Sequence, residues 1–278
     1  MSDQAQHWAD GRLGHPASLI LFVLGAARVP PEPPLPGPAL VALLSDLGLS
    51  EGAARSAILR MRRGGWLDSH RGGRTVAYSP SERVVTGHRR RAGTLSSPDE
   101  TWSGSFHALL VSVAESSRPF RDEFRRAAHI AGYRTLRSGL VIAPSDRRRE
   151  LGDILDRVPA DASVIPGWLA LDPGDARRVA GELWALDDLA AWYRQLTGRA
   201  EAASARARGA VAGAATFRAF AAATLPIYQA VADDPGLPAA LCPPDWPAPA
   251  LGRALAGALQ AFGPAVAAYL TEQRQRAT

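Results

Sequence analysis

The sequence contains no lysine and no asparagine, and Cys242 is its only cysteine. Without lysine, the chain cannot form a Schiff base with a carbonyl substrate or with pyridoxal phosphate, and it cannot carry a lysine-bearing phosphate loop. Without asparagine, it has no acceptor for N-linked glycans. A single cysteine excludes disulfides within the chain and clusters of several thiolates around zinc or iron, and it fits a reducing cytoplasm.

Long hydrophobic runs are also missing. The apolar run nearest the start covers residues 19–27, which is far short of the roughly 20 residues that a membrane span needs. Asp3 and Asp10 precede this run, whereas a signal peptide begins with positive charge. We therefore expect a cytoplasmic protein that has no membrane segment.

The patterns typical of catalytic and metal sites are absent as well. The six histidines show no His-x-x-x-His or His-Glu-x-x-His spacing, so we expect no metal site. No serine lies in a Gly-x-Ser-x-Gly turn, which is the usual position of a hydrolase nucleophile. The sequence therefore predicts a protein that is not an enzyme, with no catalytic residues and no cofactor.

Positive charge is concentrated near the start of the chain. Between Arg55 and Arg91 there are ten arginines but only two acidic residues, Asp68 and Glu82. Such a basic block is typical of a surface that binds a polyanion. Charge alone fits a solvated basic face equally well, so the predicted local structure has to decide between the two.

Two helices joined by a short turn are predicted within this region. Apolar residues of 40–47 follow helical spacing, and Gly48 is placed to end the helix. Ser50 is a candidate N-cap for the next helix, which should run to about Arg63 and stop at Gly64-Gly65. Its inward face is predicted to consist of Ala54, Ala57, Ile58 and Met61.

A hairpin is predicted directly after the basic helix. Two short strands, 66–70 and 74–78, flank Arg71-Gly72-Gly73, and the two glycines can adopt the positive φ of a tight turn. Helix, turn, basic helix and hairpin in this order predict a winged helix-turn-helix that binds DNA. The residues predicted to contact DNA are Ser50, Arg55, Ser56, Arg60, Arg63, Arg71, Arg74, Arg89 and Arg90.

Several further motifs lie in order along nearly the whole chain. They are Leu-Ser-Glu at 49–51, Arg-Met-Arg-Arg-Gly-Gly-Trp-Leu at 60–67, Arg-Thr-Val-Ala-Tyr-Ser-Pro at 74–80, Trp-Ser-Gly at 102–104, Gly-Leu-Val-Ile-Ala-Pro at 139–144 and Glu-Leu-Trp-Ala-Leu-Asp at 182–187. The most specific are Asp-Pro at 234–235, Leu-Pro at 237–238 and Asp-Trp-Pro at 245–247. In these motifs the chain resembles the PaaX-type regulators, the repressors of phenylacetic acid degradation.

The resemblance implies a mainly helical α+β protein of three domains. These are a winged helix over 1–95, a ferredoxin-like α+β domain over 96–175 and a helical domain over 176–278. It further implies a homodimeric repressor of catabolic genes, bound to a double-stranded DNA operator and released by an aryl- or acyl-CoA thioester such as phenylacetyl-CoA. The alternative is a winged-helix module that binds RNA or another protein and has no small-molecule effector.

The residues of the middle segment predict the order β–α–β–α–β. Strands are expected at 106–113, 139–143 and 162–171, and helices at 119–131 and 147–155. The first strand carries no carboxylate, and a metal-dependent nuclease would need carboxylates at a strand end. We therefore discount nuclease activity.

A thioester of coenzyme A carries phosphates and an acyl group, so its site needs arginines beside aromatic rings. The candidates are Arg134, Arg137, Trp168, Trp184 and Arg194. For each of them taken alone, ordinary core or surface is the better interpretation. In the last segment an apolar stripe at Leu251, Leu255, Leu259 and Phe262 predicts a final amphipathic helix.

Overall fold

The computed structural model describes residues 15–26, 34–72, 75–82, 84–85, 102–232, 234 and 236–277. The chain mixes helices and strands and contains more helix than strand. It forms two compact units, and both are assembled from separate stretches of sequence. Unit 1 comprises Met1–Ser97, Ala191–Asp234 and Pro247–Thr278, and unit 2 comprises Pro98–Ala190 and Pro235–Trp246. The division of the chain into three domains, which the resemblance implied, stays a prediction.

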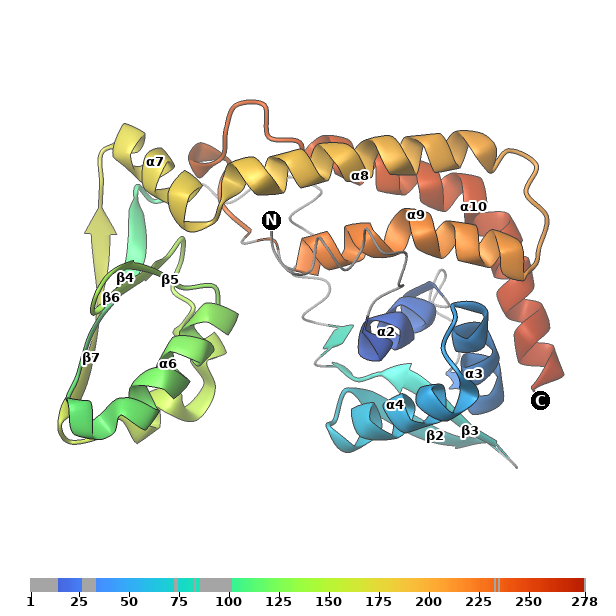
Figure 1. Cartoon of the computed structure of the whole chain (residues 1–278), viewed down its shortest axis with the longest axis horizontal. Helices are drawn as coiled ribbons and strands as arrows, with labels where there is room; N and C mark the ends of the chain where they lie inside the picture. Colours follow the sequence, from blue (N-terminus) through green and yellow to red (C-terminus); the bar gives the residue numbers. More distant parts are fainter. Residues whose placement is uncertain are drawn as a thin grey trace. The chain divides into compact units, whose positions relative to one another are not determined.

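Among the described residues, the first part of unit 1 contains three helices and a small sheet (Figure 1). They are α2 (Pro16–Ala26), β1 (Leu35–Pro36), α3 (Gly37–Asp46), α4 (Glu51–Arg63), β2 (Leu67–Gly72) and β3 (Thr75–Pro80). The sheet is antiparallel, with β3 between β1 and β2. Strand β1 lies in a proline-rich segment of the sequence. A strand of two residues is too short to show the alternation of apolar and polar residues by which a strand is predicted from sequence.

Glycines end both α3 and α4, as predicted. Gly48 has φ +90, and the N–H of Leu49 donates to the Leu44 carbonyl at 3.0 Å. Gly65 has φ +69 and the N–H of Trp66 donates to the Met61 carbonyl at 2.9 Å. Both ends have the hydrogen bonds of a Schellman motif, in which a left-handed residue satisfies carbonyls of the last turn.

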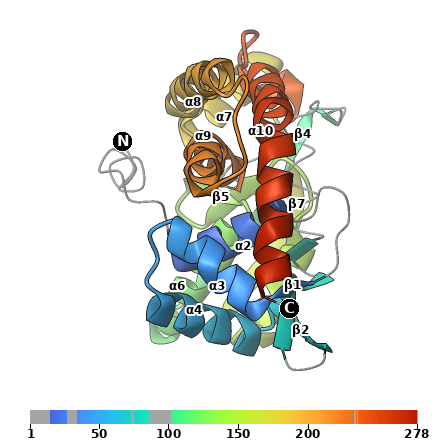
Figure 2. The same cartoon turned by 90° about the vertical axis from the view of Figure 1, so that its right-hand side faces the viewer.

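Three helices from the second half of the chain complete unit 1. They are α8 (Leu186–Arg206), whose first residues belong to unit 2, α9 (Ala214–Ala232) and α10 (Ala248–Arg276). The ring of Phe22 on α2 lies 5.6 Å from that of Phe220 on α9. Helix α10 packs against α3 and α9 (Figure 2). The helices α2, α3 and α4 therefore share one hydrophobic core with α9 and α10.

Helix α10 is long and apolar enough to cross a membrane by length and composition, and the sequence reasoning did not single it out. Its residues Phe262, Val266 and Leu270 belong to the core of unit 1, and a long core helix passes the same test. Leu259, predicted to lie on the buried stripe, is instead 37% exposed. The predicted apolar stripe was wrong at Leu259, because the buried face of α10 includes Ala258 and Phe262 instead.

Unit 2 is built around a four-stranded antiparallel sheet of order β5-β6-β4-β7. Its elements are β4 (Ser105–Val113), the 3-10 turn η1 (Glu115–Ser117), α6 (Arg118–Ile130), β5 (Arg134–Arg137), β6 (Leu140–Ala143), the 3-10 segment η2 (Arg148–Arg157), β7 (Ala162–Ala170), α7 (Pro173–Leu183) and the 3-10 turn η3 (Ala239–Leu241). Strand β5 was missed because it is short and polar. The predicted helix at 147–155 is a 3-10 segment, interrupted at Gly152 with φ +67.

The two faces of this sheet carry different cores. On one face, Leu109 and Val141 pack with Phe124 of α6 and Ile154 of η2. On the other face, Phe106 and Ile142 pack with Val179 and Ala180 of α7 and with Leu241. Successive strand residues point to opposite faces, so each strand contributes to both cores. Cys242 is buried in the second core, as a packing residue.

Candidate nucleic-acid interface

Helix α4 separates its apolar and basic residues into two faces. Ala54, Ala57, Ile58 and Met61 are buried, as the sequence predicted. The predicted DNA-contacting residues Arg55, Ser56, Arg60 and Arg63 are exposed. Four buried positions anchor the helix, so its basic face is held at the surface of unit 1.

Ser50 and Glu51 fix the beginning of α4. The Ser50 side chain is the N-cap and accepts a hydrogen bond from the Ala53 N–H at 3.3 Å. The guanidinium of Arg55 donates to the Glu51 carboxylate at 2.9 Å, across one turn of the helix. A carboxylate in the first turn also interacts favourably with the positive end of the helix dipole. Arg55 is therefore the partly neutralised member of the basic face.

The other end of α4 carries three exposed arginines, Arg60, Arg62 and Arg63. Within the described part of the chain, no carboxylate forms an ion pair with any of the three. Their positive charge is favourable at the negative end of the helix dipole, and it is available to an external anion. The sequence reasoning did not select Arg62 as a DNA contact. Its position between Arg60 and Arg63 at the end of the predicted helix could have identified it.

The β2–β3 hairpin follows α4 after three residues. A Cβ atom on Gly64 would lie 2.9 Å from the Trp66 ring, so glycine fits this junction closely. Arg71 is exposed and lies in β2 opposite Val76, and Gly72 pairs with Thr75. The prediction that Arg71 and Gly72 form the turn is therefore wrong, because the strand pairing continues through both.

Three predicted DNA contacts, Arg74, Arg89 and Arg90, lie outside the described residues, and they stay predictions. Gly73 and Arg74 are the two residues between the paired ends of β2 and β3. The basic surface that the structure describes therefore consists of the α4 arginines together with Arg71.

The predicted ligand residues have different surroundings. Trp184 is buried, and its ring stacks on Phe106 at 6.2 Å. Trp168 is 61% exposed and meets the His107 ring edge-on at 5.1 Å. The Arg134 guanidinium donates to the carbonyls of His129 and Tyr133 at 3.1 and 2.9 Å.

The remaining two candidates, Arg137 and Arg194, are both exposed. Arg137 lies on β5 in unit 2, whereas Arg194 lies on the part of α8 that belongs to unit 1. The grouping of the five residues into one effector site stays a prediction.

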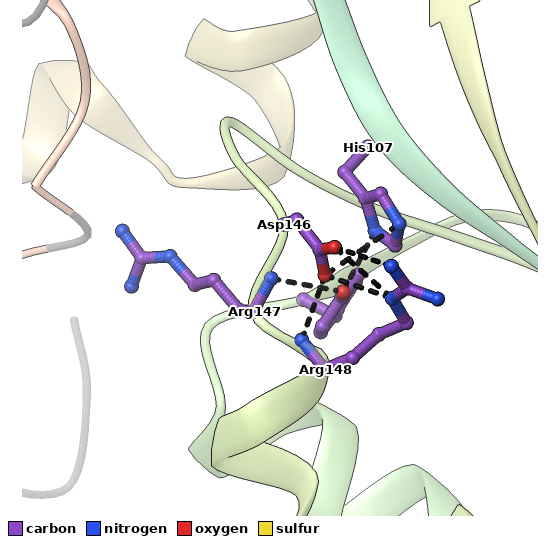
Figure 3. A network of polar contacts seen from close by, with 5 residues as sticks. His107, Asp146, Arg147 and Arg148 are labelled. Atoms are coloured by element: carbon purple, nitrogen blue, oxygen red, sulfur yellow. Dashed lines mark hydrogen bonds and ion pairs between the residues drawn. The ribbon is translucent and has the colours of Figure 1, made fainter.

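A buried polar network in unit 2 was not anticipated from the sequence (Figure 3). His107 on β4 is 2% exposed, and its Nδ1 lies 2.8 Å from the Tyr133 hydroxyl. The Arg147 backbone N–H donates to the same hydroxyl at 3.2 Å. Asp146 lies 3.7 Å from His107 Nε2 and accepts several hydrogen bonds from Arg148, the shortest at 2.6 Å. The network joins β4, the start of β5 and the loop before η2.

Burial and hydrogen bonds set the charge states in this network. Burial lowers the pKa of His107, against the opposing effect of Asp146. Burial also raises the pKa of Tyr133 to about 12. Hydrogen bonds from the Arg148 side chain lower the pKa of Asp146 to about 2. At neutral pH the network therefore contains a neutral histidine, a neutral tyrosine and an ionised aspartate. Across the described residues, no three His, Cys, Asp or Glu side chains gather as a metal site.

Comparisons with known proteins agree along the length of the chain. Residues 15–84 match the model of PaaX-like protein, residues 99–166 match the PaaX protein central Cas2-like domain, and residues 184–272 match the PaaX-like protein C-terminal domain. The transcriptional repressor PaaX of Escherichia coli K12 is 27% identical over 244 residues, which are 84% of this chain and 76% of that protein.

One solved structure is also similar. The uncharacterized protein Rv0674 from Mycobacterium tuberculosis is 24% identical, with a TM-score of 0.48, over 86% of this chain and 89% of that chain. The family matches carry the assignment, because three models follow one another in order over most of the sequence. The chain belongs to the PaaX family.

Proposed function

We propose that this protein is a transcriptional repressor that binds double-stranded DNA through α4 and the β2–β3 hairpin. The observation that carries the proposal is the end of α4, where Arg60, Arg62 and Arg63 are exposed and no described carboxylate pairs with them. A relative over most of the chain is a transcriptional repressor, which supports a regulator rather than an enzyme.

The elements of unit 1 follow the order of a winged helix-turn-helix. Helix α3, a four-residue turn and α4 are followed by the antiparallel hairpin. In such modules the second helix enters the major groove, where arginine makes bidentate contacts with guanine. Arg55, Ser56, Arg60 and Arg63 then read bases, while Arg71 and Arg74 contact the backbone from the wing. Ser50, Arg89 and Arg90 add contacts to phosphates.

The rest of the proposal concerns architecture and regulation. The order β4–α6–β5–β6–η2–β7, with sheet order β5-β6-β4-β7, supports a ferredoxin-like middle domain. Membership of the family supports a cytoplasmic homodimer that is released from its operator by an aryl- or acyl-CoA thioester such as phenylacetyl-CoA.

The test is the affinity of the full-length protein for operator DNA, mapped first by genome-wide binding. Arg60→Ala should weaken specific binding by about 1–3 kcal/mol if Arg60 contacts a base. The matched control is Arg125→Ala, an exposed arginine of α6 in unit 2, which should leave the affinity unchanged. If Arg60→Ala and Arg71→Ala both bind like the wild type, the assignment of α4 is wrong.

A competition experiment identifies the type of nucleic acid that the protein binds. Duplex DNA of the mapped sequence should displace bound operator far better than scrambled duplex or RNA, at several salt concentrations. Binding that depends steeply on salt but not on sequence reflects phosphate contacts alone. That outcome, or a preference for RNA, would contradict repression through an operator.

A further inference from the structure

Helix α4 presents a leucine among its exposed residues. Leu59 is 38% exposed, and the hydrophobic core formed by the described residues of unit 1 does not include it. The other exposed residues of α4 are charged, small or polar. A single exposed leucine is ordinary on a protein surface, so its position on the helix has to decide whether it has a role.

Leu59 lies close to the centre of the exposed face of α4. Successive residues of an α-helix are rotated by about 100° around the axis. The residues that point away from the four buried positions therefore form one stripe along the helix, which consists of Gly52, Ser56, Leu59 and Arg63. If α4 lies against another surface with its exposed face, this stripe makes the closest approach.

Arginines border the stripe on both sides. Arg55 and Arg62 lie on one side of it, and Arg60 lies on the other. For a helix in the major groove, the central stripe faces the base edges and the margins lie nearer to the two phosphate backbones. An arginine at a margin is long enough to reach either bases or phosphates. Leu59 is short, so it meets only what lies directly in front of the helix.

The chemistry of the major groove limits what a leucine can contact there. Every base pair of unmodified DNA presents hydrogen-bond donors and acceptors in this groove, and its one apolar group is the C5-methyl of thymine. Opposite a polar base edge, the leucine would displace water without replacing its hydrogen bonds, which is costly. Opposite a thymine, it buries apolar surface against a methyl group, which is favourable. Both effects favour thymine over the other bases.

We propose that Leu59 contacts the C5-methyl group of a thymine in the operator, and that this contact makes α4 select an A·T base pair at that position. The inference rests on the proposed DNA binding and adds a specificity-determining residue to it. Leu59 was not among the DNA contacts predicted from the sequence, which were all arginines and serines.

The test removes the methyl group from the DNA and the leucine from the protein, separately and together. In duplexes of the mapped operator, each thymine is replaced in turn by uracil, which forms the same base pair but lacks the C5-methyl group. Full-length wild type should bind about fourfold more weakly when the contacted thymine is replaced, the effect of losing one small apolar group. Leu59→Ala should bind the thymine operator more weakly than wild type, and it should bind the uracil operator no worse than the thymine operator.

Two controls separate this contact from general effects of substitution. Leu59→Met keeps an apolar side chain of similar size, so it should still prefer thymine to uracil. Val211→Ala removes an apolar side chain that is 78% exposed elsewhere in unit 1, and it should bind both operators like wild type. Because Leu59 is exposed and outside the core, Leu59→Ala should fold, which thermal melting verifies.

The inference is overturned if wild type binds the operator and no uracil substitution weakens that binding. It is also overturned if Leu59→Ala keeps the wild-type sensitivity to uracil, or if the substitution changes only the oligomeric state, which would make Leu59 a contact between copies. If wild type does not prefer the operator to scrambled duplex, the proposed function itself fails, and the thymine contact fails with it.

Discussion

The hydroxyl of Tyr269 on α10 donates a 2.6 Å hydrogen bond to the carboxylate of Asp46 at the end of α3. The two residues are 223 positions apart in the sequence. Because α3 precedes α4 in the proposed helix-turn-helix, this contact connects the C-terminal helix with the DNA-binding elements. Burial and the Asp46 contact together raise the pKa of Tyr269 to about 12.

Tyr269→Phe should lower the free energy of unfolding by about 1.5–3 kcal/mol, the usual contribution of a hydrogen bond to a charged group. The ring remains, so its packing beside Phe217 at 6.1 Å should persist. Urea denaturation with fluorescence detection measures the change. The control is Tyr228→Phe, which removes a hydroxyl from the same core without touching Asp46. Equal stability of wild type and Tyr269→Phe would contradict the contribution of this bond.

The raised pKa of Tyr269 predicts a loss of stability in alkali. The folded state holds the phenolic proton more tightly than the unfolded chain, whose tyrosine titrates near pH 10. The contribution is therefore complete below about pH 10 and is lost as the pH rises towards 12. Thermal melting between pH 8 and 11 should show a smaller decline in Tyr269→Phe than in wild type. A parallel decline in both proteins would refute the assignment. Tyr133, whose pKa is also raised, contributes equally to the decline in both proteins.

His107 predicts a loss of stability in mild acid. Burial lowers the pKa of His107, so the unfolded chain binds the proton more readily than the folded one. Stability is therefore present above pH 6.5, the ordinary value, and is lost as the pH falls below it. The pKa of His129 is also lowered, by the charge of Arg134. Variants of each histidine are therefore needed to separate the two contributions to stability.

The measurement for His107 is the difference in Tm between pH 7.5 and pH 5. His107→Gln cannot take up the proton, so its difference should be smaller than that of the wild type. His129→Gln serves as the control for the exposed histidine. If His107→Gln and wild type lose the same Tm between the two pH values, the buried imidazole does not control this transition.

Gly65, which follows the end of α4, should tolerate substitution poorly. Its φ is +69 and open space surrounds the position of a Cβ, so Gly65→Ala should cost about 1–2 kcal/mol from backbone conformation alone. Gly52→Ala is the matched substitution, since Gly52 lies within α4 and also has open space around it. It should stabilise the protein by about 0.5–1 kcal/mol. Chemical denaturation compares the two, and equal effects would contradict the role given to Gly65.

Arg62 provides a test of the surface that the sequence reasoning overlooked. Arg62→Ala should weaken binding to all DNA sequences alike and lower the salt slope by about 1 if the side chain contacts a phosphate. Arg60→Ala should instead reduce the preference for the operator. The two variants are compared by anisotropy titration from low to high salt. An Arg62→Ala protein with the wild-type slope would place this side chain away from the DNA.

The features predicted correctly from the sequence are those with local causes. The ends of α3 and α4 follow from Gly48, Gly64 and Gly65, and the buried face of α4 follows from helical spacing. These signals lie within a few residues of the structure that they determine. The same is true of the strand that became β4.

The features that were missed depend on residues far apart in the chain. The network of His107, Tyr133 and Asp146 forms only when β4 and the ends of β5 and β6 come together. Strand β5 is defined by its pairing with β6 rather than by its own composition.

Unit 1 is interrupted in the sequence by most of unit 2, and its core is closed by α9 and α10. During synthesis, α2, α3 and α4 therefore leave the ribosome long before Phe220 and Phe262 are available to cover them. We therefore expect these three helices to complete their core only after the later segments of unit 1 have been synthesised. A fragment ending at residue 97 would thus carry the basic helix but lack the scaffold that holds it in place.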